Sequence, residues 1–266
     1  MNVFEEIGGA VVQNFAYVGG LSEQFVSGLR ALPRVLPMIG QRGRWQAAIQ
    51  QMAAIGVAAL PMIAIMAGST GMILALQGAA ELRHFGALRY VIDLVAVGFT
   101  RELGPLLTAI VVSGRSGSAF SAEIGTMVVT SEIDALRTMA LDPIEFVLAP
   151  KYLAAIVMVP CLTIMCNLFG ILAGAGFMYL STKMALGVYV KYVLDSIFLR
   201  DVLCGLLKSV AFATIIVHVG CMEGFRVRGG PEAVGRSTTS AVVRSTFLVI
   251  LADLFFTGFF YLARLQ

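Results

Sequence analysis

Four ionisable residues interrupt stretches of the sequence that are otherwise almost entirely apolar. Arg101 and Glu102 are adjacent, and Lys208 and Asp253 lie in two later stretches of the same kind. A charged side chain at the centre of a lipid bilayer costs roughly 2.5–3.5 kcal/mol on insertion scales, so it normally faces protein or water and often lines a substrate path. The alternative is that these residues only hold neighbouring helices together.

The composition indicates a membrane protein. Of 266 residues, 58% are hydrophobic and 13% are charged, whereas soluble chains are about a quarter charged. The net charge of +3 comes mostly from Arg in connecting segments, which indicates membrane orientation and argues against nucleic-acid binding. The four cysteines and two histidines lack metal-ligand spacing, so we expect no metal site.

The uncharged runs predict the fold class, an all-α polytopic membrane protein with a single domain over residues 1–266. Residues 46–266 form the predicted transmembrane region, and the five predicted spans lie within residues 45–80, 90–113, 152–182, 202–222 and 245–263. Residues 1–45 carry two apolar stripes at helical spacing, which predict helices in the membrane interface or, alternatively, helices packed on a partner protein. A cytoplasmic N-terminus puts 11 Lys and Arg inside and 6 outside, so the positive-inside rule favours it.

The depth of each buried ion follows from the helical rise of about 1.5 Å per residue. Glu102 lies about 18 Å from the outer end of span 2, Lys208 about 9 Å from the outer end of span 4, and Asp253 about 12 Å from the inner end of span 5. Adjacent helical residues point about 100° apart, so Arg101 and Glu102 need separate partners. We predict that Arg101 forms a structural ion pair with Asp253, and that Glu102 and Lys208 face a cavity that opens outward.

The segment after span 2 predicts a short cytoplasmic helix between spans 2 and 3. The glycine-rich run at residues 114–118 is expected to be a turn that leaves the membrane. Ser131 and Asp134 match a capping box, and Ile133 and Leu136 then begin an apolar stripe that ends before the Asp-Pro pair at 142–143. Such a helix fits a groove on a partner protein, although a solvated loop helix has the same pattern.

The sequence contains no recognisable motif for nucleotide binding or hydrolysis. It has no GxxxxGK[ST] P-loop, and GRSGS at residues 114–118 is not a GxSxG nucleophile elbow. An enzyme is therefore disfavoured, because an intramembrane hydrolase needs a nucleophile and a base that we do not find. The main alternative to a transporter driven by another subunit is an ion-coupled secondary transporter, with Glu102, Asp253 and Lys208 as a proton relay. The five spans do not divide into paired repeats, which argues against it.

Five motifs, taken together, resemble one known family. They are RELGP (101–105), GRSGSAFSAEIGTM (114–127), SEIDALRTMALDP (131–143), LKSVAF (207–212) and GRSTTSAVVRS (235–245). Their order and content are similar to the MlaE family of ABC-transporter permeases, whereas residues 1–45 match only in character. The resemblance implies the permease subunit of an ATP-driven transporter that moves phospholipids between the inner and outer membranes and maintains the lipid asymmetry of the outer membrane.

The resemblance also implies partners and residue roles. It implies a homodimer in the bacterial inner membrane, an ABC ATPase subunit that binds ATP and Mg²⁺, a periplasmic MCE-domain protein, and room for a small cytoplasmic accessory subunit. This chain itself is expected to bind no cofactor. The residues expected along the lipid path are Glu102, Lys208, Leu74, Leu76 and Leu103. The residues expected to couple the chain to the ATPase are Glu123, Thr126, Met127, Glu132, Asp134 and Leu136.

Overall fold

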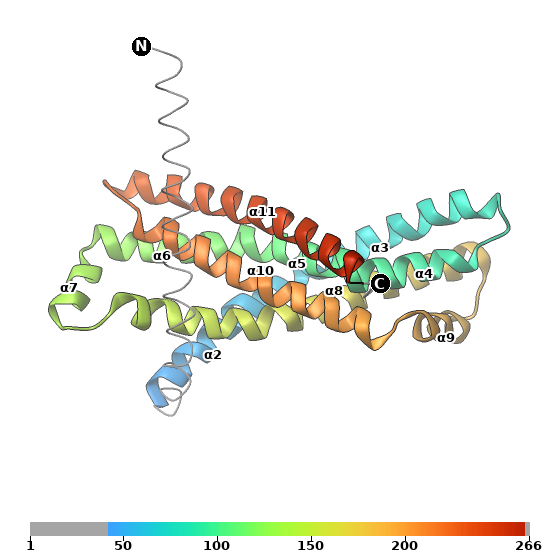
Figure 1. Ribbon diagram of the computed structural model, residues 1–266, viewed down its shortest axis with the longest axis horizontal. Helices are drawn as coiled ribbons and strands as arrows, with labels where there is room; N and C mark the ends of the chain where they lie inside the picture. The colour runs from blue at the N-terminus through green and yellow to red at the C-terminus, as the bar shows by residue number, and fades with distance from the viewer. Residues whose placement is uncertain (1–41, 264–266) are drawn as a thin grey trace, which may run out of the picture.

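The computed structural model describes residues 42–263, so the interfacial helices predicted before residue 42 lie outside the described residues. Within residues 42–263, five helices are long and apolar enough to cross a membrane, which confirms the predicted fold class (Figure 1). Their bounds are Ala48–Arg83, Arg89–Val129, Phe146–Thr182, Leu199–Phe225 and Pro231–Leu262. The part of the chain that the structure describes contains no β-strand.

The first span consists of two helices that meet at a proline. α2 (Arg42–Gly56) leads into a 3-10 turn, Val57–Ala59, and then into α3 (Leu60–Arg83), which has Pro61 in its first turn. Proline is tolerated there because the amide hydrogen that it lacks would have no partner within the helix. Pro61 therefore marks the junction between two helices.

The second span is longer than the sequence predicts. It consists, in order, of α4 (Arg89–Gly98), a π-helical segment (Phe99–Leu103), α5 (Gly104–Val112), a second π-helical segment (Ser113–Gly117) and α6 (Ser118–Val129). The predicted turn at residues 114–118 is wrong, because these residues continue the helix. Gly117 serves packing instead: a Cβ on Gly220 would come within 2.8 Å of the carbonyl oxygen of Gly117.

Both π-helical segments coincide with motifs that stand out in the sequence. A π-helical turn inside an α-helix is rare and occurs frequently at functional sites. The first segment carries Arg101 and Glu102. The second carries Ser113, whose hydroxyl forms a hydrogen bond with that of Ser245 in the last span. The irregular turns therefore position polar side chains that a straight helix would aim elsewhere.

The remaining spans are α8 (Ala149–Thr182), which follows a π-helical segment (Ile144–Leu148), α10 (Leu199–Phe225) and α11 (Pro231–Leu262). Helices α3 and α8 touch through glycines. A Cβ on Gly71 would overlap the backbone of Gly170, and a Cβ on Gly170 would overlap the ring of Phe99. Gly170 and Gly174 form a GxxxG pair, a pattern that lets another helix backbone approach closely.

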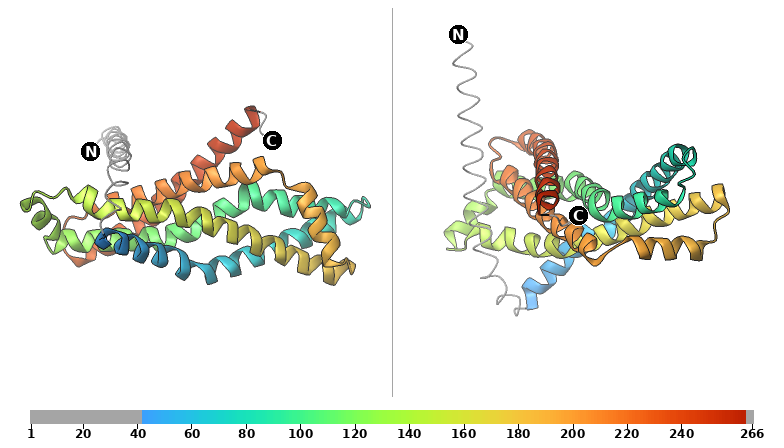
Figure 2. Two further views of the ribbon diagram at one scale, coloured as in Figure 1. Left: turned by 90° about the horizontal axis from the view of Figure 1, so that it is seen from below. Right: turned by 45° about the vertical axis from the view of Figure 1, so that its right-hand side comes forward.

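Two short helices lie at opposite ends of the bundle (Figure 1). α7 (Glu132–Thr138) is the helix predicted between spans 2 and 3. α9 (Leu186–Ser196) lies where the sequence indicates only a polar connector, and Figure 2 shows it running across the ends of the long helices. Tyr189 packs into the bundle, and burial raises its pKa to about 12, so its hydroxyl stays protonated and donates to the carbonyl oxygen of Ile171 at 3.2 Å.

Candidate functional site

A group of four polar side chains lies inside the bundle around Lys208 of α10. The Lys208 side chain is 1% exposed and donates hydrogen bonds to Glu102 Oε2, to Asp253 Oδ1 at 2.9 Å and to Thr257 Oγ1 at 2.8 Å. An ammonium group has three N–H donors, so all three are used. Because Glu102 belongs to span 2 and the other two partners to α11, this Lys208 cluster joins three spans.

The Lys208 cluster contains one cation and two carboxylates. The side chain of Glu102 is 37% exposed and that of Asp253 is 16% exposed, so the anions lie nearer to the surface than the ammonium. The hydroxyl of Thr257 lies 3.2 Å from each carboxylate oxygen of Glu102 and 2.8 Å from the backbone oxygen of Asp253. It has one proton to share among these acceptors. Glu102 is therefore the member whose partners are most readily exchanged.

The predicted ion pair between Arg101 and Asp253 is wrong. Arg101 pairs with Asp201, whose Oδ1 accepts a hydrogen bond from Arg101 Nε at 2.7 Å. The second oxygen of Asp201 accepts from the backbone N–H of Phe198 at 2.9 Å. Asp253 pairs with Lys208 instead.

The start of α10 explains this exchange of partners. The helix begins at Leu199, before the predicted start of span 4, so Asp201 lies in its first turn and not in a connector. Asp201 and Lys208 are seven residues apart, which places them on the same face of α10. That face meets the first π-helical segment, where Arg101 and Glu102 each find a partner.

The three leucines predicted along the lipid path occupy different positions. Leu103 is half-buried and follows Glu102 in the π-helical segment, and Leu74 is half-buried in α3 beside Gly98. Leu76 lies on the outer surface of α3 and is 51% exposed. Their role in a lipid path stays a prediction.

α7 is the second candidate site. Ile133 and Leu136 are buried against the bundle, with Leu136 only 8% exposed. The expectation that this apolar stripe, including Leu136, faces a partner protein is therefore wrong: it fixes α7 to its own chain. The exposed side is charged, with Glu132 and with Asp134, which pairs with Arg137 at 3.3 Å.

The predicted capping box at the start of α7 is not formed. Ser131 precedes the helix with a left-handed φ of 61°, and its side chain makes no capping hydrogen bond to Asp134 or to the backbone. α6 ends at Val129 and α7 begins at Glu132, so only two residues connect them. This tight connection uses a backbone conformation in which the serine hydroxyl does not cap the helix.

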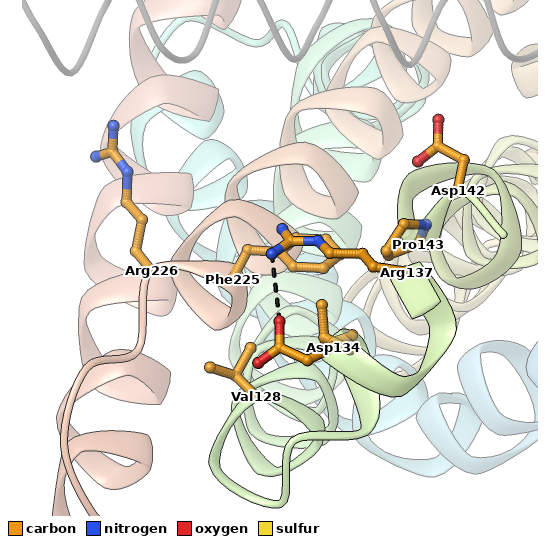
Figure 3. Close-up of a pocket in the computed structure, with 8 residues that line it drawn as sticks. Val128, Asp134, Arg137, Asp142, Pro143, Phe225 and Arg226 are labelled. Atoms are coloured by element: carbon orange, nitrogen blue, oxygen red, sulfur yellow. Dashed lines mark hydrogen bonds and ion pairs between the residues drawn. The ribbon is translucent and has the colours of Figure 1, made fainter. Parts of the chain in front are cut away.

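A pocket of about 420 Å³ lies between α7 and the end of α10 (Figure 3). Its lining residues are Val128, Ile133, Asp134, Arg137, Asp142, Pro143, Phe225 and Arg226. Figure 3 shows Arg137 crossing the pocket near Phe225 and meeting Asp134. α7 and the end of α10 therefore form one continuous surface, with apolar and charged side chains lining the pocket between them.

The other predicted coupling residues lie on α6. Glu123 accepts a hydrogen bond at 2.7 Å from Lys151 of α8, whose side chain is buried. Thr126 is exposed and donates to the carbonyl oxygen of Ala122 at 2.8 Å, and Met127 is half-buried against the core. Of these three predicted residues, Glu123 is thus the one tied to another span.

Three residues of these sites are not apparent from the sequence. Asp201 falls just before the predicted span 4, because the charges around it obscure where that span starts. Thr257 lies four residues after Asp253, and this helical spacing is the signal that could have identified it. Lys151 lies just before a long uncharged run, which resembles an ordinary flanking charge.

Comparisons with known proteins define the family. The model of the family described as Permease MlaE matches residues 48–259. The chain is 35% identical over 213 residues to a probable ABC transporter permease protein of Rickettsia prowazekii, which covers 80% of this chain and 82% of that protein. A probable ABC transporter permease protein of Synechocystis is 38% identical over 209 residues, covering 78% and 79%. Protein TRIGALACTOSYLDIACYLGLYCEROL 1, chloroplastic, of Arabidopsis thaliana is 34% identical over 246 residues, covering 91% and 68%.

The five membrane-length helices and these relatives define the class of the protein, a multi-pass permease of an ABC transporter. More narrowly, the chain belongs to the MlaE permease family, and the matched residues extend from the first span into the fifth.

Proposed function

We propose that this chain is the permease subunit of an ATP-driven transporter that moves phospholipids between the inner and outer membranes and so maintains the lipid asymmetry of the outer membrane. The observation that carries the proposal is the Lys208 cluster, a polar group held by three spans within an apolar bundle. A buried charge is costly and is retained where it serves a transport path.

The Lys208 cluster suits an amphiphilic substrate for a physical reason. A phospholipid brings a charged headgroup together with acyl chains, and the headgroup needs polar partners when it leaves water. Glu102 and Lys208 offer such partners beside apolar helices, and the exposure of Glu102 allows the exchange. The name of the Arabidopsis relative refers to a glycerolipid, which also supports a lipid substrate.

The energy is proposed to come from a separate ABC ATPase that binds ATP and Mg²⁺. α7 is suited to transmit its movement because Ile133 and Leu136 anchor its inner side while Glu132 and Asp134 face outward. We therefore place the ATPase contact on the charged side of α7 and on the rim of the adjoining pocket.

The proposed assembly contains two copies of the permease in the bacterial inner membrane, with the N-terminus and α7 on the cytoplasmic side. A periplasmic MCE-domain protein would receive or deliver the lipid, and a small cytoplasmic subunit would complete the complex. The excess of Lys and Arg on the α7 side supports this orientation.

Reconstitution tests the proposal. The chain is co-purified with its partners in mild detergent, the complex is placed in vesicles with a fluorescent phospholipid, and lipid transfer is measured with and without ATP. Transfer that needs both ATP and a second polypeptide is expected. Transfer by the isolated chain on an ion gradient alone would contradict the proposal and support an ion-coupled secondary transporter.

A further inference from the structure

α9 has two apolar sides, of which only one packs against the bundle. Tyr189 and Val193 are buried against the other helices. Leu186, Val190 and Leu194, each four residues apart, form a second row that is exposed, and Leu194 is 71% exposed. A short helix at a water-exposed surface normally carries polar residues on its outer side. The exposed row therefore indicates a second apolar environment at this end of the molecule.

Aromatic and basic side chains lie at the same end of the bundle as this row. The exposed aromatic residues there are Phe85, Tyr90, Tyr179 and Phe198. The exposed basic residues there are Arg83, Arg89, Lys183, Lys191 and Arg200, and the exposed acidic residues are Glu81 and Asp195. Aromatic rings gather at the headgroup level of a bilayer, and Lys and Arg extend their charges from apolar surface toward the headgroups. The pattern is that of a membrane–water interface with an excess of positive charge.

We propose that α9 is an interfacial helix whose exposed row enters the lipid leaflet at this end of the bundle, and that the basic residues near it recognise anionic headgroups. The exposed apolar surface of α9 continues onto a membrane-length helix, which favours lipid over a partner protein as its environment. Leu199, Leu203 and Leu207 of α10 are exposed on a membrane-length helix, and they continue the apolar surface that α9 begins. Each basic residue near an anionic surface adds attraction, which favours anionic lipids.

Two contacts hold α9 against the second span, so its position relative to the leaflet is fixed by the bundle. Arg89 lies with its guanidinium 4.8 Å from the centre of the Tyr192 ring. One turn later, at the end of α9, the hydroxyl of Ser196 donates to Asp93 of α4. These contacts leave the row of Leu186, Val190 and Leu194 directed away from α4.

α9 is also connected to the Lys208 cluster. Directly after α9, the backbone N–H of Phe198 donates to Asp201 at 2.9 Å, and Asp201 pairs with Arg101. Arg101 is the chain neighbour of Glu102 in the π-helical segment. α9 is therefore linked to Glu102, the most exposed carboxylate of the Lys208 cluster, through Asp201 and Arg101.

Depth-dependent fluorescence quenching tests the proposal. The only tryptophan, Trp45, is changed to Phe, and Leu194→Trp is introduced into the full chain reconstituted in nanodiscs. Lipids brominated on their acyl chains report contact with lipid, and iodide reports contact with water. Leu254→Trp, exposed on α11, is the lipid-facing reference, and Met139→Trp, exposed after α7, is the water-facing reference.

We expect acyl-chain bromine to quench Leu194→Trp nearly as strongly as Leu254→Trp, with little quenching by iodide. Quenching by iodide alone would place α9 in water, and protection from both reagents would place it under another protein surface. Either result overturns the proposal. None of these readings depends on transport, so the result is separate from the outcome for the proposed function.

The preference for anionic lipid is tested in the same protein. Nanodiscs of phosphatidylcholine alone are compared with nanodiscs that also contain phosphatidylglycerol, and bromine quenching of Leu194→Trp should increase with phosphatidylglycerol. Lys191→Glu together with Arg200→Glu should abolish this increase. The matched control is Arg228→Glu with Arg236→Glu, two exposed arginines at the opposite end, which should retain it. An equal loss in both pairs, or no dependence on phosphatidylglycerol, would contradict the recognition of anionic headgroups.

Discussion

Arg101 and Glu102 are neighbours in the chain but belong to two different ionic arrangements. Arg101 and Asp201 form a pair of one cation and one anion, and the Asp201 side chain is 1% exposed. Glu102 shares Lys208 with Asp253, so that one cation serves two anions, and Glu102 is 37% exposed. In the first arrangement the charges balance and the anion is buried, whereas the second has one more anion than cations and its Glu102 is accessible.

The difference indicates a division of roles within one π-helical segment. A buried, balanced pair tolerates no change of partner, because removing either member leaves an uncompensated charge. An unbalanced and accessible group can exchange a partner for water, a proton or a headgroup at lower cost. We therefore expect changes at Arg101 to affect folding, and changes at the Lys208 cluster to affect transport more than folding.

The largest effect on stability is expected for Arg101→Met. This change leaves the carboxylate of Asp201 buried without a cation, which costs about 3–5 kcal/mol of unfolding free energy. Thermal unfolding in detergent measures it. Adding Asp201→Asn in the same chain should recover most of the loss, since the amide can still accept the hydrogen bond from Phe198. If the single Arg101→Met variant is as stable as the wild type, the pair of Arg101 and Asp201 is not needed for folding, and the proposed division of roles is wrong.

A smaller loss of stability is expected for Lys208→Leu, although this change should abolish lipid transport. Glu102 and Asp253 lose their cation but remain partly accessible, so we expect a cost of about 2 kcal/mol. The lipid that co-purifies with the protein is quantified by mass spectrometry alongside thermal unfolding. Unchanged lipid content in a folded Lys208→Leu protein would contradict its role in the lipid path.

Changes at Thr257 test whether lipid transfer can be lost without a large loss of stability. Thr257→Val removes one acceptor from Lys208 and the hydroxyl that lies beside Glu102, with an expected cost of about 1 kcal/mol. We expect lipid transfer to fall while the ATPase partner still binds, and Thr257→Ser should restore transfer because it keeps the hydroxyl. Equal transfer by the Val and Ser variants would show that the hydroxyl is not needed.

The smallest effect on stability is expected for Glu132→Lys and Asp134→Lys on α7. Both side chains are exposed, and substitutions at such positions usually change stability by no more than about 0.5 kcal/mol. We nevertheless expect loss of ATPase stimulation, measured in the reconstituted complex. Normal binding and stimulation of the ATPase would exclude the charged side of α7 as the contact.

The five spans could be predicted because long uncharged runs leave a chain few alternatives in a bilayer. The partners of the buried ions could not, since they depend on where helices begin and on irregular turns. Counting a constant rise per residue assigned Arg101 to Asp253, whereas the π-helical turn and the early start of α10 bring it to Asp201. The sequence did single out the four ions, but it predicted Arg101 with Asp253 and left Glu102 and Lys208 facing a cavity, whereas Lys208 binds both Glu102 and Asp253.

The short helices show the same limit. The stripe of Ile133 and Leu136 predicted α7, but the pattern alone does not say whether an apolar side meets its own chain or a partner. α9 was missed because Lys191 and Asp195 interrupt its apolar residues and make the segment resemble a connector. In both cases the decisive information is the surrounding tertiary structure.

The contact between α3 and α8 has a consequence for how the molecule changes shape. Gly71, Gly170 and the ring of Phe99 leave no space for a single added methyl group, and tightly interlocked surfaces of this kind slide only by separating. These two helices and the start of the first π-helical segment must travel as a rigid body. α10 is held to the second span in the same way, because a Cβ on Gly205 would overlap the backbone of Thr100. Any hinge that opens a passage therefore has to lie along the seam of α11, where hydroxyls and ions meet instead of bare backbone.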